Sequence, residues 1–197
     1  MTQVSQLIAA VVKMIHSLTP ERVKYWMENL KQLKEILVGG VSRIAGAAKN
    51  VFVVNFSLPR ASALALGKFK WVAPSLADGP FPLGEGEGQK TLVPDLVGGL
   101  GYCKNTAEAQ EKLAAKLRER GLGEKPMTPR EFAAFAGAYP ELCQGKWIGI
   151  LGSVGWGAGG RQCVACFDGT GGDWDLGLDL VRDDWGDDGV FAVSREL

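Results

Sequence analysis

Apolar residues near the N-terminus recur at the three- and four-residue spacing of a helix. The pattern predicts an amphipathic helix over residues 3–18, and Thr19 then caps a second helix whose own apolar stripe ends at Gly39–Gly40. We expect the two helices to pack as a hairpin within residues 1–50. Their stripes also run at coiled-coil spacing, so residues 3–38 are an alternative surface for attachment to a partner or for a homo-oligomer.

The next part of the chain, residues 51–126, shows little hydrophobic periodicity. An apolar run predicts a short strand over 51–56, whereas 57–104 is rich in glycine and proline and is interpreted as long loops with one or two strands. A capping box that opens at Asn105 predicts a helix over 105–121. We therefore expect a loop-rich region that contains one clear helix.

From residue 127 onward, a short helix gives way to apolar and polar positions that alternate with period two. Thr128 opens this helix with a second capping box, and the helix reaches about Ala138. Four candidate strands follow, over 146–154, 161–169, 173–181 and 189–197. Helices thus come first and strands last. This order predicts an α+β fold with an N-terminal helical hairpin, further helices and a C-terminal antiparallel β meander.

The third candidate strand alternates most strictly. One face carries the apolar side chains of Trp174, Leu176, Leu178 and Leu180, and the other carries Asp175, Gly177 and Asp179. Such alternation is typical of an antiparallel strand that packs one face on a core and turns the other to water.

Composition and charge are those of a globular protein with an acidic end. The chain has 46% hydrophobic and 22% charged residues and a net charge of zero. From Arg161 to the C-terminus, eight Asp and one Glu stand against three Arg, which gives −6 and leaves +6 on the rest. A polyanion would be repelled by this end, so we expect no nucleic-acid partner. No signal peptide or membrane-length apolar run is visible, so we expect a cytoplasmic protein without a membrane partner.

Metal and redox chemistry are disfavoured by the placement of the cysteines. Cys163 and Cys166 form a C-x-x-C motif, but they fall within a candidate strand, where residues three apart point to opposite faces. A second such motif is missing, and the single histidine, His16, lies far away in sequence. We expect buried free thiols, no bound metal and no cofactor.

Catalytic chemistry has little support in the sequence. His16 lies on a helix far from the C-terminal half, so a triad with a serine or cysteine is not expected. The C-terminal aspartates are chemically suited to bind calcium or to act as an acid–base pair. They lack the register of a calcium loop, however, and alternation puts Asp175 and Asp179 on a solvent face. We therefore predict no catalytic residues and no enzyme activity.

The C-terminal motifs GKWIGILGS, GRQCVACFDG, DLGLDLVRDDW and VFAVSRE suggest a known type of module. They resemble the C-terminal module of uncharacterised proteins from small-genome microbes. In the pattern of their residues they are also similar to the variable target proteins of diversity-generating retroelements. The stretch TPREFAAFAGAYPEL is similar to the short helix that leads into this module. The resemblance implies a C-type-lectin-like fold over 127–197, with exposed positions rewritten by a reverse transcriptase.

The resemblance also implies a role for individual residues. The scaffold positions would be Trp147, Leu151, Gly152, Ser153, Arg161, Leu176, Leu178, Trp185, Phe191 and Val193. The ligand-binding positions would be Trp156, Asp168, Thr170, Asp173, Asp175, Asp183, Asp184, Asp187 and Asp188. An exposed Trp156 beside acidic side chains would anchor a basic protein or other macromolecular ligand.

Three functions follow from these observations. The first is a non-catalytic ligand-binding or display protein with a variable C-terminal recognition surface. The alternative is a structural or interaction protein of a mobile-element or phage-related assembly, acting through its N-terminal helices. The third is a metal-dependent hydrolase that uses the cluster of aspartates.

Overall fold

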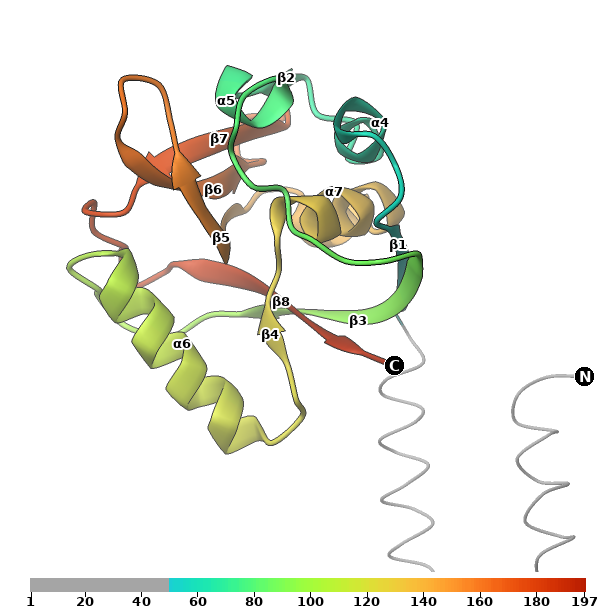
Figure 1. Cartoon of the computed structure of the whole chain (residues 1–197). Coiled ribbons are helices and arrows are strands. Elements are labelled where there is room, and N and C mark those ends of the chain that lie inside the picture. Colours follow the sequence, from blue (N-terminus) through green and yellow to red (C-terminus); the bar gives the residue numbers. More distant parts are fainter. Residues whose placement is uncertain (1–49) are drawn as a thin grey trace, which may run out of the picture. The chain divides into compact units, whose positions relative to one another are not determined.

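A computed structural model describes residues 50–197, which fold around one mixed sheet (Figure 1). The predicted helical hairpin and the surface over 3–38 lie outside the described residues. The sheet has eight strands: β1 (Phe52–Asn55), β2 (Trp71–Val72), β3 (Gln89–Val97), β4 (Lys125–Pro126), β5 (Trp147–Trp156), β6 (Gln162–Asp168), β7 (Asp175–Leu180) and β8 (Val190–Glu196). The helices are α4 (Arg60–Ala65), α5 (Pro74–Ala77), α6 (Thr106–Arg120), α7 (Pro129–Ala138) and α8 (Pro140–Cys143).

Local capping signals place the two longer helices where the sequence predicts them. The Asn105 side chain accepts a hydrogen bond from the Glu108 backbone N–H at 3.0 Å, and α6 ends at Gly121. Thr128 and Glu131 form a complete capping box at the start of α7. These predictions are confirmed because each cap satisfies backbone groups within one turn of the same helix.

The two faces of the sheet bury separate apolar clusters. Phe132 and Phe135 of α7 pack with Phe167 in one cluster, and Leu113 of α6 packs with Phe191 in the other. Side chains of β8 alternate between the two clusters, so α6 and α7 lie on opposite sides of this strand (Figure 1). Burial on both faces makes β8 a central strand of the fold.

The predicted fold class is wrong, because the four C-terminal strands do not form a meander. Strands β5, β6 and β7 pair antiparallel in sequence, but β8 does not continue from β7. Instead β8 lies between β5 and β3, parallel to β5 at two residue pairs and antiparallel to β3 at six. The strand order is β1, β3, β8, β5, β6, β7, β2, with β4 beside β8. The predicted C-terminal meander of C-type-lectin-like type is therefore wrong.

The physical reason for this difference is that β8 has two buried faces and two paired edges. Its residues Phe191, Ala192, Val193 and Ser194 are all buried. Alternation along the sequence reports which face of a strand is covered, but not which strands are its neighbours. The second neighbour, β3, lies in the segment interpreted as loops, and the sheet therefore includes strands from both sides of residue 126.

No helix within residues 50–197 has both the length and the apolar character needed to cross a membrane.

The close approach of β4 and β5 yields a prediction for stability. The Gly152 N–H donates to the Met127 carbonyl oxygen at 2.9 Å, and a Cβ on Gly152 would lie 2.4 Å from that same oxygen. Backbone cannot move aside as a side-chain tip does, so Gly152→Ala should lower the free energy of unfolding by about 1–3 kcal/mol. The measurement is urea denaturation of the whole chain.

The matched control is Gly171→Ala, since no atom lies within 4 Å of a Cβ at that position. This control should change the free energy of unfolding by less than about 0.5 kcal/mol. Equal effects of the two substitutions would contradict the predicted clash at Gly152.

Candidate ligand-binding surface

The structure places the nine predicted ligand-binding residues in three parts of the C-terminal half. One group occupies the turn between β6 and β7 and the strand ends beside it; its members are Asp168, Thr170, Asp173 and Asp175. A second group occupies the connection between β7 and β8; its members are Asp183, Asp184, Asp187 and Asp188. Trp156 lies alone at the end of β5. The nine residues therefore do not form one continuous cluster of side chains.

The turn between β6 and β7 uses its polar groups within the protein. The Asp168 carboxylate accepts hydrogen bonds from the Thr170 hydroxyl at 2.7 Å and from the Thr170 backbone N–H at 2.9 Å. These two bonds hold the pKa of Asp168 below its ordinary value. Asp173 forms an ion pair with Lys70, which raises the pKa of Lys70. These contacts stabilise the turn and leave fewer free acceptors for a ligand.

The connection between β7 and β8, residues 181–189, is here called the acidic loop. Backbone hydrogen bonds fasten it to the segment that leads into α6. Cys103 and Trp185 exchange two such bonds, of 3.0 and 2.8 Å, and the Thr106 N–H donates to the Val181 carbonyl at 2.9 Å. The loop is therefore held at two points along its length.

A buried tryptophan is the anchor of the acidic loop. Trp185 is only 2% exposed, and its indole N–H donates to the Thr106 hydroxyl at 3.2 Å. Its ring lies 5.0 Å from that of Trp147 and 5.2 Å from that of Phe191. A Cβ on Gly149 would lie 2.6 Å from the Trp185 ring, so the indole packs directly on the backbone of β5. The absence of a side chain at Gly149 makes this contact possible.

The carboxylates of the acidic loop face water on this fixed backbone. Asp184, Asp187 and Asp188 are exposed and Asp183 is half-buried. Among residues 50–197, no lysine or arginine lies within ion-pair distance of any of the four. The loop therefore carries negative charge that the described part of the protein does not neutralise.

Tyr102 adds an aromatic side chain to the acidic loop. It is 54% exposed, and a hydrogen bond with Asp184 raises the pKa of its phenol. Sequence reasoning missed this residue because it lies in a segment without hydrophobic period. An aromatic residue three positions before a helix N-cap was the available signal.

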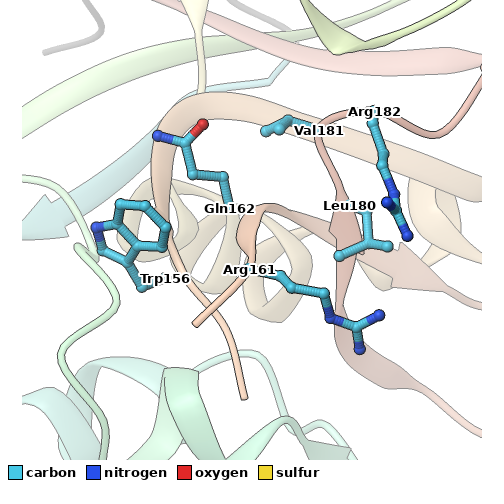
Figure 2. Close-up of a pocket in the computed structure, with 6 residues that line it drawn as sticks. All are labelled: Trp156, Arg161, Gln162, Leu180, Val181 and Arg182. Atoms are coloured by element: carbon cyan, nitrogen blue, oxygen red, sulfur yellow. The ribbon is translucent and has the colours of Figure 1, made fainter. Parts of the chain in front are cut away.

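Trp156 is exposed, as the resemblance implies, but its neighbours are not acidic. Its side chain is 56% exposed and lines a pocket of about 260 Å³. Figure 2 shows the six lining residues: Trp156, Arg161, Gln162, Leu180, Val181 and Arg182. Two arginines therefore stand where acidic side chains were expected. The reason is that the hairpin between β5 and β6 returns Arg161 to the side of Trp156, and the end of β7 brings Arg182 to the same pocket.

Half of the ten scaffold positions implied by the resemblance are buried. Leu151, Leu176, Trp185, Phe191 and Val193 are buried, whereas Arg161 is exposed and lines the pocket described above.

Comparison with protein-family models, with curated proteins and with solved structures found no match for this chain.

The two cysteines of the C-x-x-C motif lie on β6 with their sulfurs on different faces. Cys163 belongs to the cluster that includes α7, whereas Cys166 lies on the other face, beside Gly177. Within residues 50–197 no three histidine, cysteine, aspartate or glutamate side chains are grouped so that they would hold a metal ion. Burial, and to a lesser extent Asp179 and Asp168, raise the pKa of Cys166 to about 12.

This pKa predicts an unreactive thiol. An ordinary thiol with a pKa of 9.0 is half ionised at pH 9, whereas roughly one in a thousand Cys166 thiols is a thiolate at that pH. Iodoacetamide should therefore alkylate Cys166 at least about a hundredfold more slowly in the native protein than in urea, as followed by peptide mass spectrometry. Similar rates in the two conditions would contradict the raised pKa of this thiol.

Proposed function

We propose that this chain is a non-catalytic recognition protein of the cytoplasm whose acidic loop binds a basic segment of a partner protein. One observation carries the proposal. The acidic loop presents four carboxylates without an ion-pair partner among residues 50–197, on a backbone fixed by the buried Trp185.

A fixed loop suits recognition for an energetic reason. Binding orders the groups that make contact, and a loop that is already ordered loses less conformational entropy on association. The two backbone bonds between Cys103 and Trp185 and the indole bond to Thr106 provide this order in the free protein.

The chemistry of the exposed groups favours a cationic ligand. Ionised carboxylates accept charge-assisted hydrogen bonds from lysine and arginine, which are stronger than bonds between neutral groups. The exposed ring of Tyr102, beside Asp184, offers a face to the same cation. Lysine or arginine side chains of a partner would thus meet both a negative charge and an aromatic surface.

The resemblance to the target proteins of diversity-generating retroelements extends the proposal to variability. Under it, positions such as Asp184 and Asp187 are rewritten between copies of the gene, whereas Trp185 and Phe191 are kept. The structure supports this division because the first two residues are exposed and the last two are buried in the cluster that includes α6. Substitution at an exposed loop position leaves the packing of that cluster unchanged.

Neutralising the acidic loop tests the proposed binding. The variant Asp183→Asn/Asp184→Asn/Asp187→Asn/Asp188→Asn should bind a fluorescent lysine- and arginine-rich peptide at least about tenfold more weakly at physiological salt, since the ion pairs between the four carboxylates and the peptide are lost. Fluorescence anisotropy on the full chain gives the dissociation constants.

The control changes net charge by the same amount elsewhere. Glu85→Gln/Glu87→Gln/Glu119→Gln/Glu141→Gln replaces four exposed carboxylates that make no ion pair within residues 50–197. It should weaken binding by less than about twofold if the contacts are local to the loop. Equal losses in both variants would show that only overall charge matters and would refute a binding site at the loop.

The genome tests the proposed variability. The coding sequence for residues 147–195 should have a near-identical copy that differs at adenines and lies beside a reverse transcriptase gene. Absence of such a copy from the genomes of close relatives would refute the retroelement part of the proposal and leave the binding part standing.

A further inference from the structure

The pocket beside Trp156 carries positive charge that the described part of the protein does not neutralise. Its six lining residues, named above, include Arg161 and Arg182 (Figure 2). Among residues 50–197, no carboxylate lies within ion-pair distance of either guanidinium. Two like charges at one pocket repel each other, and an anion between them relieves that repulsion.

Backbone hydrogen bonds fix the positions from which the two arginines extend. The Gly157 N–H donates to the Arg161 carbonyl at 2.8 Å and closes the hairpin between β5 and β6. The Val181 N–H donates to the Gln162 carbonyl at 3.1 Å and holds the end of β7 against the start of β6. The residues next to both arginines are thus tied to the sheet, and the pocket exists before a ligand arrives.

The remaining walls of the pocket are largely apolar. The indole of Trp156 is 56% exposed, and Leu180 and Val181 contribute aliphatic surface. The volume of about 260 Å³ lies below the range of roughly 300–1,000 Å³ that is usual for cofactors and drug-sized ligands. The pocket therefore has room for a group of about the size of one amino-acid residue.

We propose that this pocket binds a carboxylate carried on an apolar or aromatic body. A guanidinium recognises a carboxylate through two parallel N–H donors, while the indole and the aliphatic walls cover the carbon skeleton of the ligand. A small carboxylic acid and an acidic side chain with an apolar neighbour share this chemistry.

The pocket shares Val181 and Arg182 with the acidic loop, but the two proposed ligands have opposite charges, so either proposal can fail without the other. The tests are distinguishable because one changes aspartates of the loop and the other changes arginines of the pocket.

The experiment is a titration of the isotopically labelled full chain with benzoate, followed by NMR. Saturable shifts are expected at the side-chain N–H signals of Trp156, Arg161 and Arg182, with the Trp156 signal assigned from Trp156→Phe. Arg161→Gln and Arg182→Gln should each weaken binding by roughly two- to fivefold, the effect of an exposed ion pair. The double variant should lose saturable binding. The control Arg118→Gln, at an exposed arginine of α6, should bind like the unchanged protein.

Three further ligands decide the remaining points. Benzamide has the same ring without the charge, and shifts equal to those of benzoate would overturn the carboxylate assignment. Tighter binding of phenyl phosphate than of benzoate would also overturn the carboxylate assignment, and the absence of saturable shifts with any ligand would overturn the pocket. A blocked Phe-Glu dipeptide distinguishes the two sources of the carboxylate, and saturable binding of either ligand supports the proposal. Tighter binding of the dipeptide than of benzoate would identify an acidic side chain as the ligand. Weaker binding of the dipeptide would identify a small acid.

Discussion

The contact between the Trp185 indole and the bare backbone of Gly149 is the constraint on which the C-terminal half depends. Strand β8 pairs with the edge of β5 that faces away from β6, so the chain leaving β7 must cross both strands to reach it. Trp185 fixes this crossing: its ring packs on β5 between Trp147 and Phe191, and its indole N–H is satisfied by Thr106. A buried tryptophan needs such a polar partner, since an unpaired N–H inside a protein costs free energy.

Because the Trp185 side chain that fixes the acidic loop is buried, the other side chains of the loop can be charged and exposed to water. The aspartates on either side of Trp185 form no ion pair within residues 50–197. The same separation holds at the hairpin between β5 and β6, where backbone bonds fix the turn and leave Arg161 without a carboxylate partner. The fold thus offers two surfaces of opposite charge, one near Tyr102 and Asp184 and one near Trp156. Backbone hydrogen bonds fix both surfaces, and the buried Trp185 side chain also fixes the first.

The parts of the fold that the sequence predicts are those that depend on neighbours in sequence. Asn105 and Thr128 mark the starts of α6 and α7 because each side chain bonds a backbone N–H within one turn. The alternation over 174–180 correctly places Leu176 with the apolar cluster of α7. Each of these features follows from spacing alone.

The parts that the sequence does not predict depend on pairing across long separations. Strand β3 contains Pro94 and Asp95 and follows a glycine-rich stretch, so its pattern is that of a loop until β8 lies beside it. Tyr102 is brought to the acidic loop by the bridge between its neighbour Cys103 and Trp185. The resemblance implied acidic neighbours for Trp156, but the turn after it brings arginines to its side. The negative net charge from Arg161 to the C-terminus therefore does not give the charge of a pocket within that part of the chain.

Amide hydrogen exchange of the full chain tests most directly whether Trp185 fixes the acidic loop. The backbone N–H groups of Cys103 and Trp185 both donate to carbonyls in the bridge that joins the two segments. We predict that these two amides exchange as slowly as those of β6, and far more slowly than that of Gly171 in the exposed turn between β6 and β7. Exchange of the Cys103 and Trp185 amides at the rate of Gly171 would show that the loop is not held, and would contradict a fixed acidic surface.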